Sequence, residues 1–278
     1  MTMPIYDSAL ARRPLITEFQ NLWAYRGLVR LLVNRELTVR YKRSALGVWW
    51  TLLNPLITTA IMWVIFGQIF GGGRFGTAGD EPYVLYLLAG VLMITFFGQA
   101  LLATGAAITG SASILTKVYV PAEVFSFATS IAGAANFLIS VIPLLAVQLI
   151  VGAGVAWTIL LAPIPLVAML ALVTGLGMLV AAAAVRFYDV VELTRLGVTL
   201  LTYATPVFYP ISIIPERFRP LVEANPLYSY LEVFRSLMYR GEIPPGWQWA
   251  VMLGSALVAL AFGVWVFSRS WRNLVSSL

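Results

Sequence analysis

Residues 48–70 read VWWTLLNPLITTAIMWVIFGQIF, a stretch that contains no charged side chain. A helix needs about 20 apolar residues to cross the hydrocarbon core of a bilayer, and this stretch is long enough. Five further apolar runs of similar length follow at 84–108, 124–151, 157–185, 191–214 and 248–268. We therefore predict an all-α membrane protein with six transmembrane helices.

The composition agrees with a membrane protein. Hydrophobic residues make up 60% of the chain and charged residues only 11%, too few to cover a soluble globule with polar side chains. The chain has no cysteine and no histidine, which excludes a disulfide framework, a thiolate metal site and the commonest metal ligand. We expect neither a metal site nor a catalytic residue.

The basic residues predict the orientation of the chain in the membrane. If both termini lie on one side, the loops of that side hold eight basic residues before Val48 and then Lys117, Arg186, Arg195, Arg269 and Arg272. The opposite side holds only Arg74, Arg217, Arg219, Arg235 and Arg240. Basic loops stay in the cytoplasm, so we expect both termini there. Residues 1–47 then form a cytoplasmic N-terminal segment, 48–270 the membrane domain and 271–278 a cytoplasmic tail.

The N-terminal segment contains an amphipathic helix. Its apolar face consists of Leu22, Tyr25, Leu28, Val29, Leu32 and Val33. We expect this helix to lie in the membrane interface; the alternative is a solvated helix packed on a cytoplasmic domain. The basic residues on and after it are predicted to meet lipid headgroups: Arg26, Arg30, Arg35, Arg40, Lys42 and Arg43.

The chain shows no sequence that would bind ATP. The lysine of a phosphate-binding loop follows a glycine, whereas Lys42 and Lys117, the only lysines, follow Tyr41 and Thr116. An ion-coupled carrier would place ionisable residues inside the bilayer, but the central parts of the six runs carry none. A membrane-embedded glycosyltransferase would be expected to show clustered carboxylates, and the one adjacent acidic pair, Asp80 and Glu81, suits a solvated turn. Both classes stay as alternatives, and we expect the energy to come from another polypeptide.

Two separated motifs carry a family resemblance. The first is RELTVRYKRSALGVWW at 35–50, which continues to Asn54-Pro55. The second is PVFYP at 206–210, followed by Ile214-Pro215-Glu216, Asn225-Pro226-Leu227 and Phe234-Arg235. Together they resemble the permease subunits of polysaccharide-exporting ATP-binding-cassette transporters, the Wzm-like family of O-antigen, teichoic acid and galactan exporters.

The resemblance implies a homodimeric permease in the bacterial cytoplasmic (inner) membrane. Two copies of a separate ATPase would bind ATP and Mg²⁺, and the cargo would be a polyprenyl-diphosphate-linked glycan, with no cofactor bound to this chain. The first and fifth spans would line the channel, where aromatic faces bind sugars weakly. The expected channel residues are Trp63, Phe66, Phe70, Tyr203, Phe208 and Tyr209. The ATPase would couple through Lys117, Tyr119, Pro121 and Glu123, with Arg186 and Asp189 in the next cytoplasmic loop.

The segment from 212 to 246 is too rich in charge and proline to span a membrane, yet too apolar for a simple loop. Short re-entrant helices between spans 5 and 6 would account for both properties and resemble the external gate of the family at 215–246. The alternative is a flat cap on the outer surface. The gate residues are Pro215, Glu216, Asn225, Pro226, Glu232 and Arg235. Pro206 and Pro210 predict a break near the outer end of the fifth span.

Overall fold

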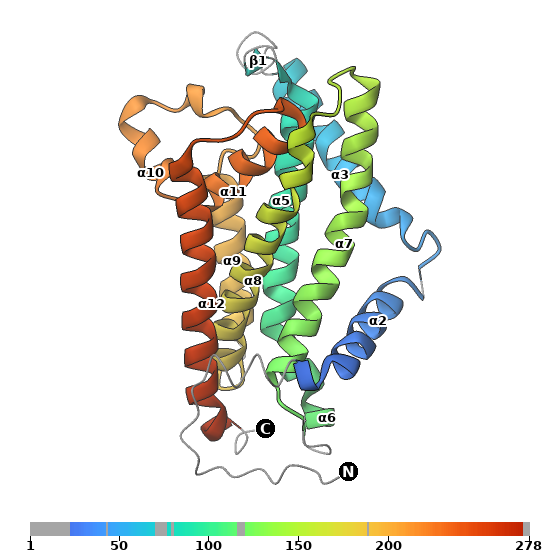
Figure 1. Ribbon diagram of the computed structural model, residues 1–278, viewed down its shortest axis with the longest axis vertical. Coiled ribbons are helices and arrows are strands. Elements are labelled where there is room, and N and C mark those ends of the chain that lie inside the picture. Colours follow the sequence, from blue (N-terminus) through green and yellow to red (C-terminus); the bar gives the residue numbers. More distant parts are fainter. Residues whose placement is uncertain are drawn as a thin grey trace.

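The computed structural model describes residues 23–42, 44–69, 77–78, 81–115, 120–187 and 189–274, and these are almost entirely helical (Figure 1). The longer helices are α2 Arg26–Lys42, α3 Trp49–Met62, α5 Tyr83–Ala106, α7 Glu123–Ile150, α8 Pro163–Ala184, α9 Asp189–Ala204, α11 Pro226–Arg235 and α12 Gly246–Leu274. Shorter helical pieces are η2 Thr109–Ser111, α6 Ala112–Leu115, η3 Trp157–Leu161, η4 Ile211–Ile213, η5 Glu216–Phe218 and α10 Arg219–Glu223. Two π-helical turns, η1 Trp63–Ile69 and η6 Ser236–Arg240, continue α3 and α11. Strands β1 Thr77–Ala78 and β2 Glu81–Pro82 form one short antiparallel pair.

Five of the six predicted spans are long apolar helices. Within the described residues these are Trp49–Ile69, Tyr83–Ala106, Glu123–Ile150, Trp157–Ala184 and Gly246–Ser270. The predicted span at 191–214 differs, because α9 has 16 residues and is therefore only about 24 Å long. Residues 205–210 continue from it without helical structure. The break expected at Pro206 and Pro210 is present, and a sixth membrane crossing stays a prediction.

Helix α5 forms the centre of the bundle. Its side chains are apolar all round, and 83% of its most apolar stretch is buried. It packs against α3, α7 and α8, and α8 in turn packs along α12. The start of α2 and the end of α12 lie at one end of the bundle, with α10 and α11 at the other (Figure 1).

Helices α8 and α12 approach each other at two glycines. A Cβ added at Gly175 would overlap the backbone carbonyl of Ala259, and one added at Gly263 would overlap the carbonyl of Gly175. Small residues are how membrane helices bring their backbones into contact. The longest helix–helix contact in the bundle therefore depends on two positions without a side chain.

The predicted apolar face of α2 packs against protein. Leu32 is buried among Val124, Phe125 and Ala128 of α7, and the rest of that face in the described residues packs around it: Tyr25, Leu28, Val29 and Val33. Leu22 lies outside the described residues. Helix α7 thus covers the side that was expected to face the lipid, while a position at the membrane surface stays a prediction.

Helices α3 and α9 are the least covered parts of the bundle. Only 17% of the most apolar stretch of α3 and η1 is buried, and α9 has no buried residue. Large apolar side chains on α9, such as Leu193, Leu200 and Tyr203, are more than half exposed. These two helices therefore leave many large apolar side chains open in one subunit.

Candidate functional site

The segment 205–210, of sequence TPVFYP, interrupts the chain directly after α9. Pro206 and Pro210 have no backbone N–H, so regular helical hydrogen bonding cannot continue through them. The carbonyl groups of such a segment must find other donors when they are buried. Residues 205–208 are buried, and the structure supplies donors from two other helices.

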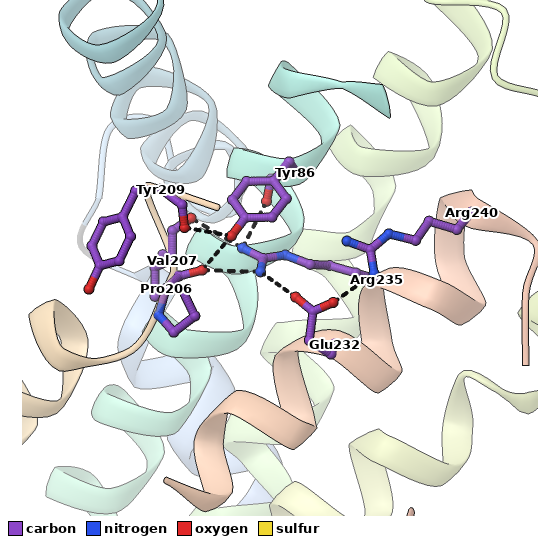
Figure 2. Close-up of polar contacts among 7 residues, drawn as sticks. All are labelled: Tyr86, Pro206, Val207, Tyr209, Glu232, Arg235 and Arg240. Atoms are coloured by element: carbon purple, nitrogen blue, oxygen red, sulfur yellow. Dashed lines mark hydrogen bonds and ion pairs between the residues drawn. The ribbon is translucent and has the colours of Figure 1, made fainter. Parts of the chain in front are cut away.

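Arg235, at the end of α11, provides two of these donors (Figure 2). Its Nη1 donates to the carbonyl of Pro206 at 3.1 Å, and its Nη2 donates to the carbonyls of Val207 at 3.1 Å and Tyr86 at 3.3 Å. Nη1 also donates to Glu232 Oε1 at 2.9 Å. The side chain is completely buried, and these four bonds use all but one of the five N–H donors of a guanidinium.

Two tyrosines near the start of α5 hold the same segment from the other side. The Tyr86 hydroxyl lies 2.8 Å from the carbonyl oxygens of both Pro206 and Tyr209 and donates to them. The Tyr83 hydroxyl donates to the carbonyl of Phe208 at 2.6 Å. The Arg235 guanidinium also lies over the Tyr86 ring, 3.5 Å from its centre. The conformation of the broken segment is therefore set by α5 and α11 together.

The Glu232 carboxylate forms ion pairs with two arginines, one of which is the buried Arg235. Its Oε1 accepts from Arg235, and its Oε2 accepts from Arg240 at 2.7 Å. Burial by itself would raise the pKa of the Glu232 carboxyl, but the two guanidiniums outweigh it and hold the pKa below its ordinary value of 4.5. The carboxylate thus stays charged at neutral pH and completes a cluster of two cations and one anion.

This cluster predicts a loss of stability in acid. A carboxyl whose pKa is lowered on folding stabilises the fold above its unfolded pKa of 4.5, and that contribution disappears as the pH falls through the folded value. We expect the melting temperatures of wild type and Glu232→Gln to differ by a constant amount above pH 5 and to converge below about pH 4.5. The exposed Glu216→Gln serves as control and should follow wild type at every pH. A difference that stays constant down to pH 3.5 would contradict the role of Glu232.

The helix that carries Arg235 is fixed on several sides. Gln148 Nε2 donates to the carbonyl of Met238 at 3.0 Å, and Thr158 Oγ1 donates to that of Leu237 at 2.9 Å. The Tyr230 hydroxyl donates to the carbonyl of Met252 in α12 at 2.9 Å. At the other end of α11, Asn225 accepts from the Leu227 N–H and donates to Thr205 Oγ1 at 2.8 Å.

The expected channel residues from the first and fifth spans meet at this break. The rings of Phe66 and Phe208 are stacked with 6.4 Å between centres, and Tyr203 lies 6.3 Å from Phe208. The Tyr209 hydroxyl donates to the carbonyl of Tyr203. Trp63 and Tyr203 are exposed, whereas Phe208 is only 8% exposed. Phe70 lies outside the described residues.

The expected gate residues fall into two groups. Pro215, Glu216 and Pro226 are exposed at the surface. Asn225, Glu232 and Arg235 instead point into the protein, where they make the bonds given above. Short helices do occur in the segment expected to form the gate, but their insertion into the membrane stays a prediction. The second group fixes the fold of this region from within.

The structure describes only some of the residues that were expected to contact the ATPase or the lipid headgroups. Lys117, Tyr119 and Arg43 lie outside the described residues. Pro121 precedes the first residue of α7 by two positions, and Glu123 at that start is 6% exposed. Arg186 and Asp189 are exposed at the connection between α8 and α9. The described basic residues of α2 are exposed as well: Arg26, Arg30, Arg35, Arg40 and Lys42.

Sequence reasoning missed Tyr83, Tyr86 and Gly90. A Cβ added at Gly90 would lie 2.6 Å from Arg235 Nη2, so glycine leaves room for the guanidinium. The sequence does hold one signal: Tyr83 and Tyr86, three residues apart, share a face at one end of an apolar run, and buried tyrosine hydroxyls require partners. Among the described residues no group of three or more acidic side chains could hold a metal ion.

The chain is similar to known membrane transport proteins. The sequence profile of the ABC-2 type transporter family matches residues 27–239. The O-antigen export system permease protein RfbA of Myxococcus xanthus is 29% identical over 232 residues, which cover 83% of this chain and 87% of that protein. A protein of the same name from Klebsiella pneumoniae is 26% identical over 218 residues, which cover 77% of this chain and 81% of that protein.

Proposed function

Because this chain belongs to the ABC-2 type transporter family, we propose that it is the channel-forming permease subunit of an ATP-driven polysaccharide exporter. The cargo is a polyprenyl-diphosphate-linked glycan, and the membrane is the bacterial cytoplasmic membrane with both termini on the cytoplasmic side. The relatives support this substrate class, since they are named as O-antigen export permeases and are matched over more than four-fifths of their length.

The observation that carries the proposal is the uncovered surface of α3 and α9. Phe208 of the broken segment contacts both Phe66 of η1 and Tyr203 of α9, while most side chains of α3 and α9 are left open by the rest of the subunit. Exposed Trp63 and Tyr203 give this surface aromatic faces that can stack on the C–H faces of sugars. Such contacts are weak and do not require one register, so a long glycan can advance over them.

A second copy of the chain completes the passage. Two subunits related by a twofold axis would place α3 and α9 of each opposite those of the other, and would cover apolar surface that one subunit leaves open. The passage then ends at the broken segments 205–210, which Arg235 and Tyr86 hold in place.

The energy comes from a separate ATPase subunit, which binds ATP and Mg²⁺. The end of the bundle that carries α6 and the start of α2 is the docking side, because Pro121, Glu123, Arg186 and Asp189 lie at helix ends there. Lys117 and Tyr119 are expected to take part in the same contact. This chain supplies no phosphate-binding loop, so purified alone it should not hydrolyse ATP.

A reconstituted system tests the proposal. Vesicles that contain the chain and its partner ATPase should export lipid-linked glycan only with ATP, and the double variant Trp63→Ala, Tyr203→Ala should export about 2–10-fold more slowly, since an aromatic contact contributes about 0.5–1.5 kcal/mol. Association with the ATPase should not change. The matched control is Trp265→Ala with Phe262→Ala, an exposed aromatic pair on α12.

Three results would argue against the proposal. Equal export by the channel double variant and the α12 control would remove α3 and α9 from the passage. ATP hydrolysis by the isolated chain would remove the need for a partner. Export driven by an ion gradient without nucleotide would assign the chain to a different class of transporter.

A further inference from the structure

A groove with polar walls lies between α2, α3, α5 and α7, and it shares with the proposed passage only helix α3, through Pro55. Thr95 and Gln99 of α5, Thr129 and Asn136 of α7 and Arg40 of α2 provide its polar groups. Gln99 is exposed in the middle of an otherwise apolar helix. Polar side chains exposed to hydrocarbon are unfavourable, so this groove requires a polar occupant.

Hydrogen bonds to Asn136 connect three of the helices that border the groove. The hydroxyls of Tyr41 and Thr51 both donate to Asn136 Oδ1, and Tyr41 lies 3.0 Å from Thr51. These bonds connect the end of α2 to the first turn of α3 and to the middle of α7. Because two donors occupy its oxygen, the amide nitrogen of Asn136 is the group left to donate to a ligand.

The charge of the groove indicates an anionic ligand. Arg40 is the one charged residue among those that line it, and no carboxylate lines it in the described part of the chain. Glu36 precedes Arg40 by one helical turn but is not part of the lining. The amides of Gln99 and Asn136 and the hydroxyls of Thr95 and Thr129 add donors. A phosphate with neighbouring hydroxyl groups would satisfy this set, since arginine binds phosphate oxygens in a bidentate manner.

The inner wall of the groove is apolar. Leu92, Phe96 and Phe137 line it next to the polar groups, and all three are buried in the core of the bundle. This wall backs the polar groups but leaves almost no surface open to a ligand. We infer that the groove binds the headgroup of one anionic phospholipid, with its phosphate at Arg40 and its headgroup hydroxyls at Gln99 and Asn136, while the acyl chains lie in the surrounding bilayer.

Native mass spectrometry of the full chain in detergent, titrated with phosphatidylglycerol or phosphatidylcholine, tests this site. Phosphatidylglycerol carries a phosphate and two free hydroxyls, whereas the choline headgroup brings a cation for which the lining has no carboxylate. We expect one site at which phosphatidylglycerol binds about tenfold more tightly, and Arg40→Gln should remove that difference, since a charge-assisted hydrogen bond is lost. Arg217→Gln, which changes an exposed arginine outside both the groove and the basic segment predicted to meet lipid headgroups, should bind like wild type.

A second variant distinguishes a loss of lipid binding from a loss of folding. Gln99→Leu makes α5 more apolar, so its insertion should not suffer, and it should weaken phosphatidylglycerol binding by about 2–10-fold through the loss of a neutral hydrogen bond. Equal binding of the two phospholipids, or retention of the preference in both variants, would overturn the inference. So would displacement of phosphatidylglycerol by undecaprenyl phosphate with the same dependence on Arg40, because the groove would then belong to the glycan carrier.

Discussion

Replacing Arg235 with methionine is expected to lower the free energy of unfolding by about 3–5 kcal/mol, the usual cost of removing one partner from a buried ion pair. Methionine fills a similar volume but donates nothing. The carbonyls of Tyr86, Pro206 and Val207 would lose donors, and Glu232 would keep only Arg240. Unfolding in mixed micelles of dodecylmaltoside and sodium dodecyl sulfate, followed by circular dichroism, measures the change.

Arg217→Met is the matched control for this experiment. Arg217 lies in η5, between the broken segment and α11 in the sequence, and is exposed. Its main contact is with the neighbouring Phe218 ring, 4.6 Å from the guanidinium carbon. We expect this variant to unfold like wild type. Similar stability of the two variants would show that the bonds to the broken segment contribute nothing to the fold.

Gly263→Ala is the second change with a large expected effect. The new Cβ would overlap the backbone carbonyl of Gly175, and a backbone atom cannot rotate out of the way, so α8 and α12 must separate. We expect a loss of about 3 kcal/mol, at the upper end of the range for added atoms in a packed core. The same unfolding titration checks it, and Gly175→Ala should behave alike because it meets the carbonyl of Ala259.

Gly254→Ala isolates this effect from helix propensity. Gly254 is also in α12, and an added Cβ there meets no atom within 4 Å. Alanine favours a helix over glycine, so this variant should be as stable as wild type or up to about 1 kcal/mol more stable. Opposite signs at positions 254 and 263 are therefore the expected result. A similar gain at both positions would mean that the two helices are not in backbone contact.

The long helices could be predicted from sequence because each is longer than the membrane is thick and lacks internal charge. The fifth was the exception. Its apolar run 191–214 includes both α9 and the segment after it, and only Pro206 and Pro210 mark where one gives way to the other. Apolarity reports the surroundings of a residue rather than its backbone conformation, so the run could not show where the helix ends.

The arrangement around Arg235 was much harder to predict. Its nearest partner in sequence, Glu232, is three residues away, but Tyr86 is 149 residues away and Pro206 is 29. Carbonyl groups are the same at every residue, so no side-chain pattern identifies the ones that bind a guanidinium. The sequence therefore led to the prediction that Arg235 belongs to a gate, and it did not show that the side chain is buried.

The uneven covering of the helices has a mechanical consequence. When a load acts on parts connected in series, the most compliant part takes up most of the displacement. Helices α5, α8, α11 and α12 are stiff members, joined by backbone contact at Gly175 and Gly263 and by buried bonds such as those of Tyr230 and Arg235. Helices α3 and α9 are compliant, because few of their side chains are held. A push at the end of the bundle that carries α6, the docking side in the proposed function, should therefore appear as displacement of α3 and α9 over a nearly rigid block.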